Sequence, residues 1–239
     1  MLVYRILQDL RAMVAEGVTT QDLEMAAEKM IANAGAKPAF KGYYTQASGT
    51  QYPFVLCTSV NEEVVHGMPS AKRRLRSGDI LSIDTGVLLD GYYGDSALTV
   101  PVGEVNESVK RLLKITEESL ELAIERARSG NRLFDVCGTV ERHVMQNGFS
   151  IVREFVGHGI GTSLHEEPQI PNYVDRRGEN PRLKPGMVLA IEPMVNAGKP
   201  ETKVLPDKWT AVTKDKSYSA HFEHMVAVTD NGPWVLTRP

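Results

Sequence analysis

Two segments of the chain repeat one another, and this repeat limits the architecture more than any other feature. LRSGDILSID occupies residues 75–84 and LKPGMVLAIE occupies residues 183–192, so Leu, Gly, Leu and Ile recur at a constant spacing of 108 residues. The same spacing places Glu192 at the position of Asp84. Each segment alone is a turn followed by a buried strand, which is a common pattern. We favour a duplicated α/β half whose copies face each other across a shared site, because both copies also end in an acid.

The hydrophobic periodicity predicts helices and strands interspersed along the chain. Helical patterns cover 1–16, 19–34, 107–129 and 133–147, and strand-like runs cover 54–59, 80–85, 87–89, 97–100, 188–191, 220–228 and 234–237. Asp90-Gly91 is a two-residue turn signal between β-rich flanks and predicts a hairpin. We therefore expect an α+β fold in a single domain, 1–239, with halves near 1–105 and 106–239.

Two acids lie close together if residues 90 and 91 form the turn. Asp84 is then opposite Ala97, and Asp95 lies two residues along the partner strand on the same face. Such diagonal neighbours are roughly 7–8 Å apart, and two carboxylates at that separation repel unless one is protonated or a cation lies between them. Taken alone, the pair is also compatible with two solvated acids at a hairpin edge.

Three residues of the second half extend this set. Glu192 directly follows the apolar run VLAI, and Glu223 lies at the start of the apolar run HMVAV, where a bare carboxylate is costly to bury. His158 lies between two glycines, which leave its imidazole accessible. With Asp84 and Asp95 these residues form an oxygen-rich set suited to Mn(II), Fe(II), Co(II) or Zn(II). Four carboxylates indicate two divalent ions rather than one.

Other chemistries are excluded by what the sequence lacks. Cys57 and Cys137 are the only cysteines and lie far apart, which excludes a disulfide framework and a thiolate zinc site. HEEPQ at 165–169 is not the H-E-x-x-H of a zincin helix, GHGIG has no phosphate-binding lysine, and G-x-S-x-G is absent. The net charge of −3 and the lack of a long apolar run give no reason to expect nucleic-acid specificity or a membrane partner.

Five separated motifs resemble those of the type I methionine aminopeptidases. They are TSVNEEVVHGMP at 58–69, DTGVLLDGYYGDSALT at 84–99, FVGHGIGTSLHEEPQIPNY at 155–173, LAIEPMVNAG at 189–198 and SAHFEH at 219–224. They occur in the family's order, and the resemblance covers nearly the whole chain, so it is far more specific than one short motif.

The resemblance implies the pita-bread fold, a single catalytic domain of two pseudo-twofold-related α/β halves around a dinuclear metal site. Asp84 and Asp95 would be metal ligands, with Asp95 bridging the ions. His158 and Glu192 would each bind one metal only, and Glu223 would bridge. Glu192 would also move a proton from the attacking water to the leaving amine.

The resemblance also implies a set of residues that contact the substrate. His66 matches the family histidine near the substrate amide and leaving group, and His165 matches the one that contacts the substrate carbonyl. The methionine pocket would be lined by Tyr43, Tyr52, Cys57 and Trp209. Two departures lie beside this pocket: residues 44–51 look like an insertion, and Leu164 replaces a commonly aromatic residue. The first helix also looks shorter than that of relatives.

The implied reaction is removal of the initiator methionine from nascent proteins whose second residue is small. A proline-specific pita-bread peptidase is the nearest alternative. Those relatives carry an added N-terminal domain, and the segment before Asp84 is expected to be too short to hold one. A non-enzymatic binding protein of the same fold is less favoured, because all five ligands are present. The 26 residues between His165 and Glu192 are too few for the helical insertion of type II enzymes.

The expected partner is the N-terminal methionine of peptide and protein substrates. We expect a cytoplasmic monomer, and the two separated cysteines agree with a reducing compartment. The family context adds a transient contact with the ribosome.

Overall fold

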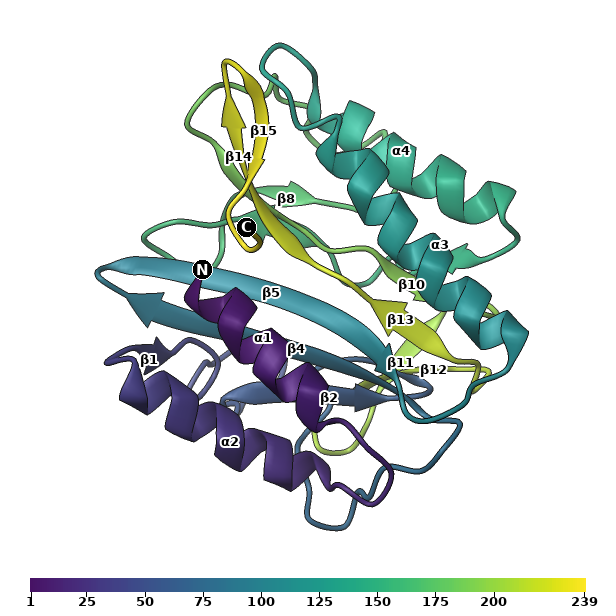
Figure 1. Ribbon diagram of the computed structural model, residues 1–239. Helices are drawn as coiled ribbons and strands as arrows, with labels where there is room; N and C mark the ends of the chain where they lie inside the picture. The colour runs from purple at the N-terminus through teal and green to yellow at the C-terminus, as the bar shows by residue number, and fades with distance from the viewer.

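Two pairs of helices enclose the β-sheets from opposite sides in the computed structural model, which describes residues 1–239 (Figure 1). The helices are α1 (Leu2–Met13), α2 (Thr20–Asn33), α3 (Glu107–Ile124) and α4 (Leu133–Gln146). All four agree with the helical patterns of the sequence, but α3 ends before residue 129. After Ile124 the backbone hydrogen bonds tighten, as from Ala127 N–H to the Ile124 carbonyl, and the chain turns at Gly130.

The first half of the chain forms a sheet in the order β1-β4-β2, with β5 paired to β4. Its strands are β1 (Lys37–Pro38), β2 (Leu56–Val60), β4 (Ile80–Leu89) and β5 (Tyr92–Pro101). Asp90 and Gly91 both have positive φ, as a type I′ turn requires. The register pairs Asp84 with Ala97 and Gly86 with Asp95, which confirms the predicted hairpin alignment. The two runs expected at 80–85 and 87–89 are one continuous strand.

The remaining sheets come from the second half, except that β3 of the first half pairs with β12. A five-stranded sheet has the order β15-β14-β9-β7-β8, and two three-stranded sheets have the orders β13-β10-β6 and β11-β12-β3. Their strands are β3 (Glu63–Val65), β6 (Ser150–Ile151), β7 (Gly157–Gly159), β8 (Glu166–Ile170), β9 (Val188–Ile191), β10 (Met194–Asn196), β11 (Thr202–Val204), β12 (Ala211–Thr213), β13 (Ser219–His221), β14 (His224–Thr229) and β15 (Gly232–Val235). The single strand expected at 220–228 is therefore wrong. The chain changes pairing partner at residues 222–223, from β10 to β9.

Strand β5 of the first sheet joins the chain between β13 and β14 at this break. We call this line of contacts the seam. The Glu223 N–H donates to the Ala97 carbonyl at 2.9 Å, and the Ser96 hydroxyl donates to the Glu223 carbonyl at 2.6 Å. The Thr99 hydroxyl donates to the His221 carbonyl at 2.7 Å and accepts from the His221 N–H. Ala97 and Glu223 are matching positions of the repeat. In the first copy Asp84 lies opposite Ala97, and in the second copy Ile191 lies opposite His224, which places the next residue, Glu192, opposite Glu223. Matching residues of the two copies thus meet each other.

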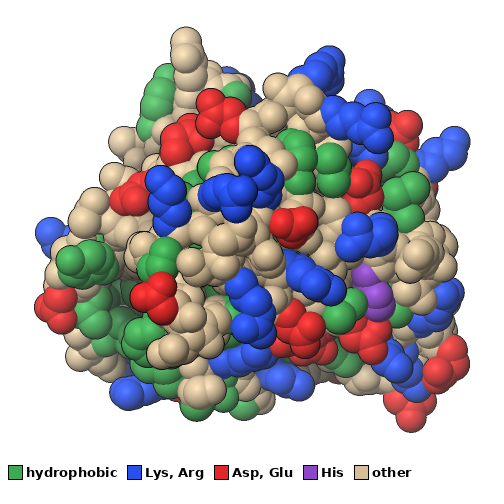
Figure 2. Space-filling view, turned by 90° about the horizontal axis from the view of Figure 1, so that it is seen from above, with side chains coloured by type: hydrophobic (Ala, Val, Ile, Leu, Met, Phe, Trp, Pro, Cys, Tyr) green, Lys and Arg blue, Asp and Glu red, His purple; other side chains and the backbone are tan.

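Each helix pair covers its own apolar core. Leu10, Leu23, Leu81 and Ile83 are buried between α1, α2 and the first sheet, and the second core lies under α3 and α4. The outer surface seen from above mixes Lys and Arg with Asp and Glu (Figure 2), as on an ordinary solvated surface. No helix is long and apolar enough to cross a membrane.

A buried acid on α2 holds the start of β2 and gives a prediction about stability. The Glu24 carboxylate, 4% exposed, accepts from the N–H groups of Val55 and Leu56 at 2.8 and 2.9 Å. Glu24→Ala would leave two buried donors without partners, so the free energy of unfolding is expected to fall by about 2–4 kcal/mol in urea denaturation. Glu28→Ala on the exposed side of the same helix is the control, with a change below about 1 kcal/mol. Equal losses in both variants would contradict the prediction.

Candidate metal centre and substrate pocket

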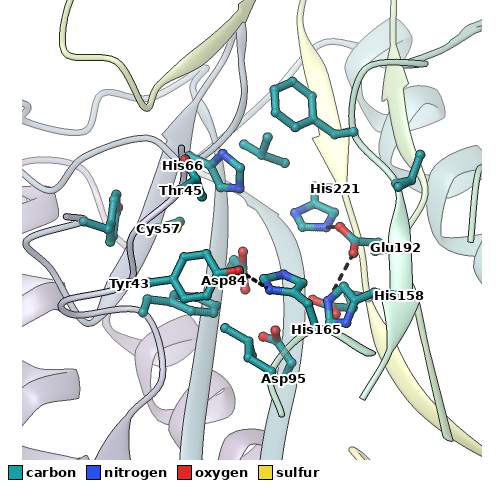
Figure 3. Close-up of a pocket in the computed structure, with 18 of the residues that line it drawn as sticks. Tyr43, Thr45, Cys57, His66, Asp84, Asp95, His158, His165, Glu192 and His221 are labelled. Atoms are coloured by element: carbon teal, nitrogen blue, oxygen red, sulfur yellow. Dashed lines mark hydrogen bonds and ion pairs between the residues drawn. The ribbon is translucent and has the colours of Figure 1, made fainter. Parts of the chain in front are cut away.

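A cavity of about 520 Å³ lies beside the seam, and every site residue predicted from the sequence lines it (Figure 3). The predicted residues are Tyr43, Tyr52, Cys57, His66, Asp84, Asp95, His158, His165, Glu192, Trp209 and Glu223. They come from both halves of the chain and meet because β5 is joined to the chain between β13 and β14. The repeat therefore brings together side chains that are far apart in sequence.

The strands fix where the carboxylates lie. Asp84 on β4 and Asp95 on β5 share one face of the hairpin, and Glu223 enters from the seam. Ligand atoms of Asp95, His158 and Glu223 lie within 4.8 Å of one another. Asp84 and Glu192 line the same cavity beside this tighter group.

Three carboxylate oxygens in this cluster are buried without any hydrogen-bond partner. They are Asp84 Oδ1, Asp95 Oδ1 and Glu223 Oε1. Leaving such an atom unsatisfied costs about 1–3 kcal/mol, and more for a charged group. A divalent cation would satisfy all three, and carboxylate oxygens with one imidazole are a donor set that Mn, Fe, Co and Zn accept. The residues present therefore fit a divalent metal.

The acids hold protons when no cation compensates them. Burial raises the pKa of Asp95 to about 7. Burial raises the pKa of Asp84 well above its usual range, and the neighbouring charges of Asp95 and Glu192 add to the effect. Burial also raises the pKa of Glu192 and of Glu223, and Asp95 again contributes. Positive charge in the centre would reverse these shifts, because it favours the ionised carboxylates.

The cavity histidines are neutral near pH 7. Burial lowers the pKa of His66 to about 4 and that of His158 below its usual value. Burial lowers the pKa of His165 to about 4, with a further contribution from His158. His158 Nδ1 lies 2.9 Å from the Gly159 carbonyl, so it carries the proton. Its Nε2 lone pair is thereby left free for a metal.

His221 is a cavity residue that the sequence reasoning missed. Its Nε2 lies 3.5 Å from Glu192 Oε2, while His158 Nε2 lies 3.7 Å from Glu192 Oε1 (Figure 3). The two imidazoles flank the carboxylate of Glu192. The 108-residue spacing alone would carry Asp95 onto Lys203, and only the pairing of β9 with β14 places His221 where the first copy has Asp95. The sequence alone therefore held no signal for this residue.

The wall of the cavity away from the acids is apolar and aromatic. The Tyr52 and Trp209 rings pack edge to face at 5.2 Å between centroids, and His66 lies between Trp209 and Phe155. The Tyr52 hydroxyl is occupied, since it donates to the Leu56 carbonyl at 2.8 Å, so only its ring faces the cavity. Such a wall suits the flexible, polarizable side chain of methionine. Phe155 was not predicted from the sequence.

Cys57 and Leu164 complete this wall, together with Phe40. Burial raises the pKa of the Cys57 thiol well above its usual range, so it remains a neutral, apolar group rather than a nucleophile. Leu164 is buried among the same side chains. The aliphatic residue at this position therefore still packs against the pocket.

The segment 44–51, expected as an insertion, forms a hairpin over the pocket. Gly42 N–H donates to the Tyr52 carbonyl at 2.7 Å, and Tyr52 N–H donates to the Tyr43 carbonyl at 2.8 Å. The Trp209 indole N–H donates to Thr50 Oγ1 at 3.1 Å, which ties the hairpin to the pocket wall. The hairpin is thus held at its base by backbone pairing and, beside Gln51, by the Trp209 side chain.

Comparison with known proteins agrees with this geometry. The family model "Metallopeptidase family M24" matches residues 2–230. Methionine aminopeptidase 1 of Bacillus subtilis (strain 168) is 48% identical over 231 residues, which is 97% of this chain and 90% of that relative. Methionine aminopeptidase of Escherichia coli (strain K12) is 43% identical over 237 residues, 99% of this chain and 87% of the relative.

Solved structures share the whole architecture. The crystal structure of methionine aminopeptidase from Thermotoga maritima matches with a TM-score of 0.94 at 44% identity, covering 100% of this chain and 93% of that one. Prolidase from Pyrococcus horikoshii OT3 matches with a TM-score of 0.76 at 23% identity, and only 59% of it is covered. The predicted pita-bread fold is confirmed, and the proline-specific alternative has less support. The chain belongs to metallopeptidase family M24.

Proposed function

We propose that this chain hydrolyses the N-terminal peptide bond of proteins that begin with methionine, and that it prefers a small second residue. The observation that carries the proposal is a cluster of orphaned carboxylate oxygens and a neutral imidazole beside an apolar pocket. The chain matches most of the length of relatives named methionine aminopeptidase, which supports the same reaction.

We propose further that the centre holds two divalent ions, from Mn, Fe, Co or Zn. Four carboxylates carry more negative charge than one such ion balances, and Asp95 and Glu223 would contribute one acid from each half. Asp84, His158 and Glu192 would complete the ligand set. When bound, the ions would supply Lewis-acid polarisation and a water acidified toward neutral pH.

The chain's own residues would carry the proton transfers. Glu192 lies between His158 and His221 and would take the proton of the attacking water and pass it to the leaving amine. His165 would donate an N–H to the developing oxyanion, and His66 would contact the departing nitrogen. Both are neutral, so each can donate one hydrogen bond without adding charge.

We also propose that the chain is a single catalytic domain whose two halves meet at the seam, because matching residues of the repeat pair there. We propose that the enzyme acts in the cytoplasm, where new polypeptides present their N-termini, and that it acts as a monomer. A transient contact with the ribosome would bring it to such chains.

The test is methionine release from Met-Ala-Ser and Met-Pro peptides by protein freed of metal and reloaded separately with each ion. Release that requires both a metal and a free N-terminus is the expected result, with the N-acetylated peptide as the control. No release with any ion, despite binding of two ions per chain, would overturn the proposal.

His165→Ala is expected to lower kcat by about 10²–10³-fold, because it removes an oxyanion donor. Metal affinity, measured by calorimetry, is expected to stay within about threefold, since no ligand is lost. His143→Ala, outside the cavity, is the matched control. A large loss of metal affinity in His165→Ala would argue that this histidine is a ligand instead.

A further inference from the structure

We propose that Tyr43 is a positioning residue that sets which nitrogen of His165 carries the proton. The inference rests on the proposed function, in which His165 must present an N–H to the substrate carbonyl oxygen. It gives the tyrosine hydroxyl a role apart from that of the tyrosine ring, which lines the methionine pocket.

The hydrogen bond that carries the inference joins the Tyr43 hydroxyl and His165 Nδ1 at 2.7 Å (Figure 3). The two rings lie 5.1 Å apart between centroids. Burial raises the pKa of Tyr43, so the side chain is a phenol with one O–H to donate. The hydroxyl has no second hydrogen-bond partner in the protein, so Nδ1 of His165 is the acceptor it can reach.

A neutral imidazole has one N–H and one lone pair, and the partner of one nitrogen decides which form is present. When the phenol donates to Nδ1, that nitrogen uses its lone pair, and the ring proton is on Nε2. The Nε2–H form is the one that can stabilise a developing oxyanion. The opposite form would turn a lone pair toward that negative charge.

The hairpin at 44–51 explains how the hydroxyl reaches its acceptor. Backbone hydrogen bonds join Tyr43 to Tyr52 at the base, and Thr50, next to Gln51, accepts from the Trp209 indole N–H. His165 faces Tyr43 from one side and packs against His158 at 4.3 Å between ring centroids on the other. The imidazole is therefore held between the hairpin and the metal centre.

The first test compares Tyr43→Phe with Tyr44→Phe in the metal-loaded enzyme, using Met-Ala-Ser. Tyr43→Phe keeps the ring and removes the hydroxyl, so kcat is expected to fall about tenfold while KM changes less than about twofold. Tyr44 is 57% exposed and contributes only its backbone to the hairpin, so Tyr44→Phe is expected to match the unmodified enzyme. An unchanged kcat in Tyr43→Phe, or a rise in KM alone, would overturn the proposal.

The second test observes the tautomer directly by ¹⁵N NMR of histidine-labelled, metal-free protein. The His165 signal is assigned by its loss in His165→Ala. We expect Nε2–H in the unmodified protein and a larger Nδ1–H fraction in Tyr43→Phe. Nδ1–H in the unmodified protein would overturn the proposal.

The two tests separate this inference from the function on which it rests. The NMR measurement needs no substrate and no turnover, so the tautomer is read even if methionine is not released. Failure of peptide hydrolysis with the expected tautomer would refute the proposed function and leave the Tyr43–His165 coupling supported.

Discussion

Glu192→Gln is expected to lower kcat by about 10³-fold, within the range seen when a general base is removed. Glutamine keeps the shape of the side chain but cannot take a proton from water. Nε2 of His158 and of His221 lie 3.7 and 3.5 Å from the two carboxylate oxygens, so an amide of the same shape has room in the same position. The loss should therefore appear in kcat more than in KM.

Metal content has to be controlled in this experiment, because Glu192 is also a proposed ligand. Activity is compared at saturating metal, and bound ions are counted by elemental analysis of the same samples. Glu154→Gln, which removes another cavity acid, is the matched control and should change kcat less than about threefold. A Glu192→Gln enzyme that keeps both ions and more than a tenth of its activity would remove Glu192 from the role of base.

Removing the ions is expected to abolish turnover and to make the protein less stable as pH rises above about 7.5. Burial holds the folded pKa of Asp95 at about 7, against about 3.9 in the unfolded chain. Asp84, Glu192 and Glu223 are shifted in the same direction. The folded state thus binds more protons than the unfolded state in this range, and stability falls as they are released.

The histidines determine the pH range in which this loss of stability can be measured. Their folded pKa is lowered, as for His66 at about 4 and His221 at about 3, and the unfolded histidines lose their protons only above their ordinary pKa of about 6.5, so the histidines stabilise the folded state increasingly as pH rises toward about 7.5. Below that pH the two effects oppose each other. Above it the histidines are neutral in both states, and only the acids remain. The free energy of unfolding of the metal-free protein is therefore expected to fall between pH 7.5 and 8.5, by up to about 1.4 kcal/mol per pH unit for each acid that is still protonated in the folded state.

Urea denaturation at several pH values, with and without metal, measures this effect. The metal-loaded protein should show a nearly flat profile, because its carboxylates are already ionised and paired with positive charge. Asp95→Asn without metal should lose part of the slope. A metal-free protein whose stability rises from pH 7.5 to 8.5 would show that the acids are already ionised when folded.

The parts of the fold that follow from local chemistry could be predicted from the sequence. Asp90-Gly91 dictates a turn with two positive φ values, and that turn sets the register that brings Asp84 and Asp95 onto one face. The repeat at 108 residues indicated that Glu192 belongs to the same site. Each inference needs only neighbours along the chain or one constant spacing.

The parts that depend on contacts across the seam could not be predicted in this way. An apolar run from 220 to 228 has the period of one strand, and only the Ala97 carbonyl, from the other half, explains why it breaks at Glu223. The contact between the Tyr43 hydroxyl and His165 depends on how a hairpin of irregular sequence folds over the pocket. Short strands such as β7 and β12 carry too few residues for periodicity to be visible.

Because of the seam, hydrogen exchange at the backbone amide of Glu223 depends on whether the metal centre is occupied. This N–H is bonded to the Ala97 carbonyl, so it exchanges with solvent only when the two sheets move apart. Ions held by acids of both sheets would bind the joined form and not the separated one, and exchange would slow further as the ion concentration rises above the dissociation constant. Deuterium uptake at this one backbone position would therefore report how tightly the protein holds its ions, with no peptide present.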